Sequence, residues 1–452
     1  MRLSNENPLD KIPLPAAPAV LVHTDSLIAE IIQGDSDIQR LIKIATLRSC
    51  AVVFTPVENP EVQNILHEND LDVANYYLQN NQYIVKSNFI HASFSSETDE
   101  KFAEEFQLEN GYSLNDSMLI GNRYFHHHVS NTIPGSTPLH VILDILQVYH
   151  VKNKIFRSDQ NSSTNQFFYD LISVNKQIPA YKSLVIRFNY LKNAYKGDFG
   201  TIENLLQSLN DRMLLMNKSV IELKYQSLKT VSNDASTEIM YHLSYFVILV
   251  TGSFDNLAWI VNYICDLGFS LENSNKNQVK LQNAYNPAKK PNESYYKSLS
   301  LKAPSICNYL LSEKISCLID FVYPLRDAIQ HRSFIKPLTV TKVSSGKTSP
   351  NKLLIWFPDD VRKILQRFFS PDSFGFEEDT SQSMRRDYYD IYVFSKKLHA
   401  EIIELVNAIS TKIALEAVVK VTDEQTEKIK LAQQTYEDNP FVGLGIQREM
   451  AY

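Results

Sequence analysis

Residues 321–334 read FVYPLRDAIQHRSF and place ionisable side chains directly after an apolar run. Up to this point apolar residues repeat every three or four positions, which is the spacing of one face of an α-helix. They are Leu311, Ile315, Leu318, Val322, Leu325 and Ile329. The pattern predicts an amphipathic core helix over residues 309–332. Because Pro324 lacks a backbone N–H, we expect the helix to bend just before Arg326 and to direct its last turns away from the core.

A polar, basic cluster ends this predicted helix and contains Arg326, Asp327, His331 and Arg332. Arginine carries a permanent planar set of donors that fits a phosphate, and histidine can give or take a proton near neutral pH. A phosphate-binding group and a proton-transfer group are sufficient for phosphodiester chemistry without a metal. The cluster is therefore the strongest candidate for a catalytic site in the chain.

The string RDAIQH, from Arg326 to His331, resembles the Rx4-6H motif of the HEPN superfamily (higher eukaryotes and prokaryotes nucleotide-binding domain). The order of the predicted elements is also similar to that family. A long apolar helix, an insertion, the motif helix and a closing helix resemble its bundle of four or five helices. The resemblance covers about residues 200–420.

This resemblance implies a metal-independent endoribonuclease without a cofactor, often a toxin or an antiphage effector. Arg326 would bind and stabilise the scissile phosphate, and His331 would transfer a proton as the 2′-hydroxyl of RNA attacks. Asp327 holds the polar position that is commonly Asn in the family, and it would orient the pair by hydrogen bonding. An antitoxin or another regulatory partner is expected as well. Ser333 stands where the subgroup paired with nucleotidyltransferase antitoxins has Tyr, so regulation through that Tyr is not expected.

Helix geometry gives a reason to expect a homodimer through the motif helix. Positions five residues apart on an ideal helix lie about 140° apart, so Arg326 and His331 of one chain do not share a face. Two motif helices that cross near a twofold axis would bring two arginines and two histidines into one cleft. We therefore expect an interface that is buried around Arg326.

Two other interpretations of the motif stay open. In the first, a HEPN-like bundle without catalysis binds a nucleotide, RNA or a partner protein. In the second, the chain is an interaction scaffold in which Arg326 forms an ion pair with Asp320 or Asp255. Arg326→Ala should then lower stability, whereas removal of an active-site arginine usually costs little stability.

The composition limits how RNA could be bound. The chain has 452 residues, with 45 Lys+Arg against 51 Asp+Glu and a net charge of −6, which excludes a general nucleic-acid coat. Any RNA contact must therefore be local, and residues 276–302 are the expected place because lysines outnumber acidic residues there. Either this polar stretch is a solvated insertion, or it is a basic arm on which Tyr295 and Tyr296 stack with bases.

The expected fold is mainly α, a HEPN-like helical bundle with a β-hairpin after the motif helix and a mixed α/β N-terminal region. Residues 1–152 form that N-terminal region of unknown role, residues 153–420 the helical domain with its core at about 200–420, and residues 421–452 a polar tail. N-terminal strands are expected at 50–54 and 82–94, and helices at 37–46 and 139–149. In the helical domain, helices are expected at 181–195, 201–231, 236–267, 309–332, 360–369 and 386–419, and a hairpin at 338–343 and 353–357.

Residues 243–264 are apolar enough to suggest a membrane span, but Asp255 and Asn256 lie at their centre. A charge at the centre of a bilayer costs about 2.5 to 3.5 kcal/mol on insertion scales, so the segment is predicted to be a buried core helix. Its polar residues form one narrow stripe, which would face either solvent or the cleft of the motif. The stripe consists of Ser244, Thr251, Asp255, Asn262 and Asp266.

Other motifs in the chain predict no further chemistry. The four cysteines lack a CxxC spacing and the N-terminus lacks the apolar core of a secretory signal, which favours a cytoplasmic protein without membrane contact. The histidines at 126–128 lack partners at metal-ligand spacing, and the GKT in SSGKTSP (344–350) lacks the first glycine of a phosphate-binding loop. No metal site is expected.

Overall fold

The computed structural model describes most of the chain, in segments separated by gaps. They are residues 19–22, 24–46, 51–54, 57–73, 75–79, 82–86, 91–94, 117–120, 139–152, 166–191, 198–228, 233–272, 276–282, 293–331, 337–340, 343–344, 347–348, 352–357, 359–368, 374–378, 387–415 and 421–438. Over these residues the chain is mainly helical, which confirms the predicted fold class at that level.

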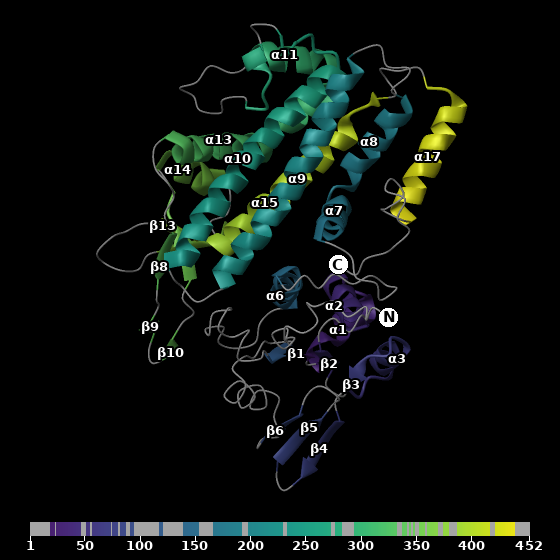
Figure 1. The fold of residues 1–452 in the computed structure, drawn as a ribbon, viewed down its shortest axis with the longest axis vertical. Helices are drawn as coiled ribbons and strands as arrows, with labels where there is room; N and C mark the ends of the chain where they lie inside the picture. Colours follow the sequence, from purple (N-terminus) through teal and green to yellow (C-terminus); the bar gives the residue numbers. More distant parts are fainter. Residues whose placement is uncertain are drawn as a thin grey trace, which may run out of the picture.

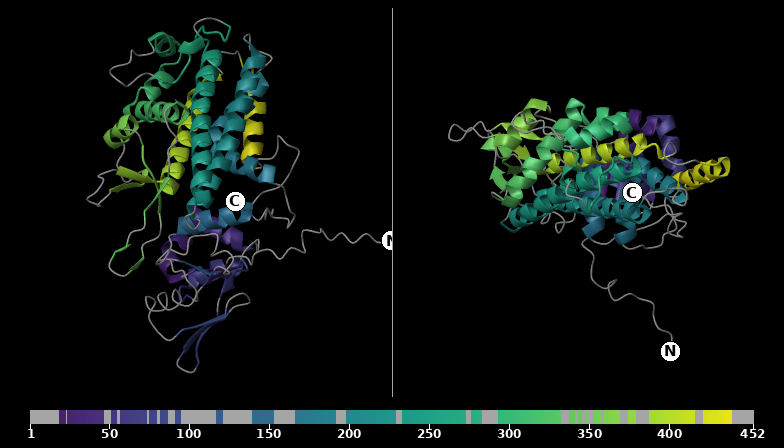
Figure 2. Two further views of the ribbon diagram at one scale, coloured as in Figure 1. Left: turned by 60° about the vertical axis from the view of Figure 1, so that its left-hand side comes forward. Right: turned by 90° about the horizontal axis from the view of Figure 1, so that it is seen from above.

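Two long helices, α9 (Phe199–Leu228) and α10 (Asn233–Ile264), lie side by side along the long axis of the molecule (Figure 1). The helix α15 (Ile391–Lys412) packs on the same pair, and α13 (Glu313–His331) packs on α10. Figure 2 shows the same neighbours from two further directions. The outcome is a helical bundle in which each long helix buries an apolar face.

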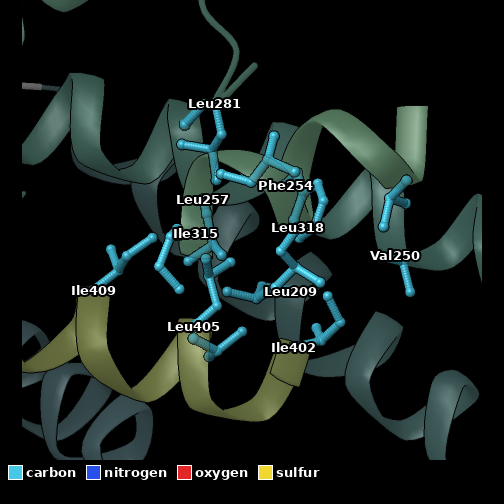
Figure 3. Packing of buried hydrophobic residues seen from close by; sticks show 14 of the residues in the cluster. Leu209, Val250, Phe254, Leu257, Leu281, Ile315, Leu318, Ile402, Leu405 and Ile409 are labelled. Carbon is cyan, nitrogen blue, oxygen red and sulfur yellow. The ribbon is translucent and has the colours of Figure 1, made fainter. Parts of the chain in front are cut away.

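The core lies where α9, α10, α13 and α15 meet (Figure 3). Leu209, Phe254, Leu318 and Leu405 come from these four helices in turn, and none of them retains exposed surface. Burial of each such side chain contributes about 1.5 to 3 kcal/mol. The apolar residues that repeat every three or four positions from Ile391 to Ile413 form one buried face, and each of them is at most 1% exposed. They are Ile391, Phe394, Leu398, Ile402, Leu405, Ile409 and Ile413.

Shorter helices surround these four. They are α6 (Leu139–Lys152), α7 (Gln166–Gln177), α8 (Pro179–Leu191), α11 (Glu293–Lys302), α12 (Pro304–Leu310), α14 (Asp359–Phe368) and α17 (Asp423–Asp438). The last of them lies within the expected polar tail and packs along α8, where the Gln433 side chain donates a hydrogen bond of 2.6 Å to Ser183.

The expected hairpin after the motif helix is present. Strands β8 (Pro337–Val340) and β11 (Lys352–Ile355) pair antiparallel, with Leu338 opposite Leu354. They belong to a four-stranded sheet in the order β12-β13-β11-β8, in which β12 is Phe376–Glu378 and β13 is Asp387–Asp390. The short strands β9 (Val343–Ser344) and β10 (Lys347–Thr348) form a separate antiparallel pair.

The N-terminal residues combine strands with helices. The strands β1 (Ala19–Val22), β2 (Ala51–Phe54) and β3 (Asp72–Val73) pair parallel, and β7 (Ser117–Ile120) pairs antiparallel with β1. The connections contain α1 (Ile28–Gln33), α2 (Ser36–Thr46) and α3 (Pro60–Glu68), as parallel pairing requires. The strands β4 (Asn75–Gln79), β5 (Gln82–Lys86) and β6 (His91–Phe94) form a second, antiparallel sheet.

A buried ion cluster joins α6 to the bundle. The carboxylate of Asp144 on α6 accepts a hydrogen bond of 2.7 Å from Lys224 on α9 and 2.6 Å from the Tyr392 hydroxyl on α15. It also forms an ion pair with Lys396 on α15. The two lysines outweigh the effect of burial, which alone would raise the pKa of Asp144, and lower that pKa to about 2. Asp144 is therefore ionised and links three helices.

Two helix predictions were wrong at their ends. The helix expected over residues 309–332 is divided at Leu311. This residue is 45% exposed and is not part of the buried apolar face. The Ser312 hydroxyl donates a hydrogen bond to the Tyr309 carbonyl, which competes with the helical hydrogen bonds at this point. The helix expected over 386–419 begins only at Ile391. Residues before it pair as β13, and the Asp390 carboxylate caps the helix by accepting from two backbone N–H groups.

The apolar helix predicted to lie in a core does so. Residues Ala235–Ile264 of α10 are long and apolar enough to cross a membrane, but 72% of their most apolar window is buried inside the protein. This resembles the core helix of a soluble protein.

Candidate functional site

The helix α13 combines a buried face with a polar edge. Its residues Leu325 and Ala328 are fully buried, and Ile329 is 7% exposed. Pro324 lies inside the helix, where it removes one backbone donor, and α13 continues through it to His331. The polar edge between these buried positions carries Arg326, Asp327 and Gln330.

Arg326 is held on its own helix and keeps contact with solvent. Its Nη1 donates a hydrogen bond of 3.0 Å to Oε1 of Gln330, one turn further along, and lies 3.3 Å from Oδ1 of Asp327. The side chains of Arg326 and Asp327 are 30% and 43% exposed. Asp327 is thus adjacent to the guanidinium, as its expected orienting role requires, and neither side chain belongs to the core.

His331 is the last residue of α13. On a regular helix, positions 326 and 331 are about 140° apart, whereas position 331 follows position 327 by one turn. The side chain of His331 lies outside the described part of the structure, as do Arg332 and Ser333.

Asp255 on α10 lies next to the polar edge of α13. The Tyr323 hydroxyl donates a hydrogen bond of 2.9 Å to Oδ1 of Asp255, and the Tyr323 ring contacts Phe254 at 6.1 Å between centroids. Burial raises the pKa of Tyr323 well above its usual value, and the charge of Asp255 acts in the same direction. Tyr323 therefore stays protonated and is the donor in this bond.

The charges of three cations act on this carboxylate. The side chain of Asp255 is exposed, yet the protein packed around it raises its pKa. The Tyr323 hydrogen bond and the charges of Arg326, Arg212 and Lys280 lower the pKa of Asp255, but they do not cancel the increase caused by burial. Asp255 was one of the two expected partners of Arg326, and its charge does act on Arg326. At short range, however, Arg326 forms its ion pair with Asp327.

Arg212 on α9 reaches this group over a glycine. A Cβ added to Gly252 of α10 would lie only 2.7 Å from Cζ of Arg212, so the guanidinium occupies the space that any other side chain would need. Glycine inside a helix costs roughly 0.5 to 1 kcal/mol relative to alanine, and Asp255 follows Gly252 by one turn. Among the described residues Nε of Arg212 has no hydrogen-bond partner although it is buried.

The polar stripe predicted on α10 is only partly a surface feature. Thr251 and Asn262 are 4% and 1% exposed. Their polar groups are satisfied locally, because the Thr251 hydroxyl binds the carbonyl of Val247 and the Asn262 amide exchanges two hydrogen bonds with the backbone of Phe269. Asp255 is the member of the stripe that meets the motif helix.

The two tyrosines of the basic region do not offer rings for stacking, so that expectation was wrong. Tyr295 is fully buried and its hydroxyl donates to the Ala258 carbonyl at 3.0 Å, while Tyr296 is 7% exposed and its hydroxyl donates to the Leu281 carbonyl at 2.5 Å. Both rings belong to the core beneath α11. The lysines at 297 and 302 on the same helix are exposed.

The weaker motifs add no site. Residues 126–128 lie outside the described residues, and the GKT segment contributes to the β9–β10 pair. Within the described part of the chain, no three His, Cys, Asp or Glu side chains are grouped as metal ligands.

Comparison of the chain with protein-family models, with curated proteins and with solved structures finds no match.

Proposed function

We propose that the protein is an endoribonuclease of HEPN type that cleaves RNA without a metal and acts as a toxin or an antiphage effector. The observation that carries this proposal is the position of Arg326. It lies in an RDAIQH string at the C-terminal end of a core helix, exposed, with an adjacent carboxylate and a second arginine nearby.

In the proposed reaction the 2′-oxygen of a ribose attacks the neighbouring phosphorus and the bond from phosphorus to the 5′-oxygen breaks. A 2′,3′-cyclic phosphate and a 5′-hydroxyl result. Arg326 neutralises the charge that develops on the phosphate, because a guanidinium presents planar donors to phosphate oxygens. His331 moves a proton, either from the attacking hydroxyl or to the leaving oxygen. Asp327 orients the guanidinium of Arg326, from which it lies 3.3 Å away.

A second copy of the chain completes this site in the proposal. Both positions belong to α13, and positions five residues apart on a regular helix are about 140° apart, so one chain is not expected to direct both side chains toward one phosphate. Two motif helices related by a twofold axis do so. Light scattering should therefore show a dimer at micromolar concentration, and a strict monomer that still cuts RNA would contradict the composite site.

The test of the activity is an incubation of single-stranded RNA with the protein in EDTA, followed by analysis of the product ends. The proposal predicts 2′,3′-cyclic phosphate and 5′-hydroxyl ends. Substrate with a 2′-O-methyl group at each position should resist cutting, because the nucleophile is blocked. Products with 5′-phosphate ends, or cutting that stops in EDTA, would contradict the proposed chemistry.

The contacts of Arg326 also support a second candidate, a HEPN-like module that binds RNA without cutting it. Arg326 already has two partners on its own helix, Gln330 and Asp327. Salt-dependent binding of RNA that stays intact, with the same affinity for the 2′-O-methyl form, would favour this alternative.

A further inference from the structure

We propose that Arg212 is a second phosphate-binding residue of the same surface, and that it holds the RNA backbone next to the phosphate at Arg326. This inference rests on the proposed function in assuming RNA as the ligand. It assigns a role to a residue that lies far from the motif in the sequence, on α9 rather than α13.

The first observation is that the place of Arg212 is built into α10. Gly252 leaves room for the guanidinium where a Cβ would overlap it. A helix interior normally favours alanine over glycine, so this position gives up helix stability and gains a path for Arg212 across α10. Asp255, whose pKa the charge of Arg212 lowers, follows Gly252 by one turn of α10.

The second observation is that Arg212 and Arg326 act on one carboxylate from two helices. Both lower the pKa of Asp255, and so does Lys280. Asp327 is a further acid, beside Arg326. Among these five residues the three cations exceed the two carboxylates by one positive charge, on a chain whose net charge is −6. A polyanion is the ligand that such an excess favours.

The third observation concerns unused donors. Within the described residues Nε of Arg212 is buried and has no hydrogen-bond partner. A guanidinium carries five N–H donors and binds phosphate oxygens with two of them at once. The hydrogen bond from Tyr323 fixes Asp255 against the motif helix. In the proposal Arg212 binds one phosphate of the strand and Arg326 binds the next.

The test measures binding of a 2′-O-methyl single-stranded RNA in EDTA at several salt concentrations, so that cutting does not enter. Arg212→Ala should weaken binding about tenfold and reduce the slope of log affinity against log salt by ~0.7, the value for one phosphate contact on a single strand. Arg212→Lys should recover part of the affinity, because the charge returns without the planar fork. Lys218→Ala removes an equal charge from another face of α9 and should change binding less than twofold.

Gly252→Ala is the matched variant. This variant keeps Arg212 and replaces glycine with the residue of highest helix propensity. Its new methyl group, however, takes the space of the Arg212 guanidinium and displaces it. It should weaken binding as Arg212→Ala does while the melting temperature stays equal or rises. If Arg212→Ala does not fold, Gly252→Ala alone decides. Affinity and slope equal to those of wild type in the deciding variant would overturn the role of Arg212.

The outcomes separate this inference from the nuclease. If wild type cuts unmodified RNA and Arg212→Ala binds and cuts like Lys218→Ala, only the role of Arg212 is contradicted. If wild type binds through Arg212 but leaves unmodified RNA intact, the nuclease is contradicted and the phosphate site stands.

Discussion

Tyr323 donates a hydrogen bond to Asp255 over 2.9 Å, and this bond connects the helix that carries Arg326 to α10. Tyr323 is 7% exposed and lies one turn before Arg326, so its ring belongs to the core while its hydroxyl reaches the surface cluster. The bond therefore links the packing of the bundle to the position of the candidate site.

Tyr323→Phe removes only this hydroxyl and should lower the free energy of unfolding by about 1 kcal/mol, because Asp255 is exposed and water replaces part of the bond. It should also raise the pKa of Asp255, since the hydrogen bond lowers it. Denaturant unfolding and NMR titration of the carboxyl measure the two effects. A pKa of Asp255 that stays unchanged would show that the bond is not formed in solution.

Asp144→Asn should destabilise the protein by about 3 to 5 kcal/mol, because it leaves the buried Lys224 without its charged partner. The matched variant Asp37→Asn removes an exposed acid whose pair with Arg40 lies at the surface, and it should cost less than about 1 kcal/mol. Urea unfolding of both variants checks the difference. Equal losses would mean that the buried cluster adds nothing beyond a surface pair.

The same cluster makes stability depend on pH. The pKa of Asp144 is lowered to about 2 from 3.8, so its ionised form stabilises the fold above about pH 4, and this contribution of roughly 2 kcal/mol is lost as the pH falls through 2. Burial lowers the pKa of Lys224 despite Asp144, so the charged lysine offsets part of this gain at every pH below its lowered pKa, and the offset is relieved as the pH rises above it. Asp144→Asn should flatten the stability profile between pH 4 and pH 2 and leave its shape near neutral pH less affected.

His399 should lower the stability of the fold at mildly acidic pH, above the range in which Asp144 titrates. Burial, aided by the charge of Lys224, lowers the pKa of His399 from 6.5 to about 3, so the unfolded chain binds a proton that the folded chain does not. Stability should therefore fall as the pH drops from 6.5 toward 3, by about 2 kcal/mol at pH 5. His399→Leu removes this loss, and comparison of unfolding at pH 7 and pH 5 measures it. A variant with the wild-type pH dependence would contradict a buried neutral imidazole.

Tyr295→Phe and Lys297→Ala separate packing from RNA binding on α11. Loss of the buried Tyr295 hydroxyl removes its hydrogen bond to the Ala258 carbonyl and should cost about 1 kcal/mol of stability, with RNA affinity unchanged. Lys297 is exposed, so its removal should leave stability unchanged and, if the basic region contacts RNA, reduce the salt dependence of binding. RNA affinity that falls in Tyr295→Phe would contradict a purely structural role of this hydroxyl.

Much of the helical architecture was predictable because its signals are local. The repeat from Ile391 to Ile413 and the apolar run of α10 each specify a buried face within one segment. The break at Leu311 and the strand before Ile391 were not, since both depend on competing hydrogen bonds rather than on periodicity. The RDAIQH string was sufficient to identify Arg326 and Asp327 as candidate site residues.

Arg212 could not be found in the same way, because its role depends on how α9 and α10 are aligned. Only that alignment puts its guanidinium over Gly252 and near Asp255. The signal available in the sequence was Gly252, a glycine inside an apolar helix, which indicates a close approach by another group. The burial of Tyr295 and Tyr296 likewise follows from the packing of α11 and not from its polar, lysine-rich composition.

Single-turnover cleavage of one RNA in EDTA by wild type, Arg326→Ala and His331→Ala, with melting temperatures recorded for all three, tests the central claim most directly. The account predicts that wild type cuts and that each variant loses at least a hundredfold in rate. Their melting temperatures should stay within a few degrees of wild type, because position 326 lies outside the core and position 331 ends the helix. Intact RNA with wild type, or equal rates in all three proteins, would contradict it.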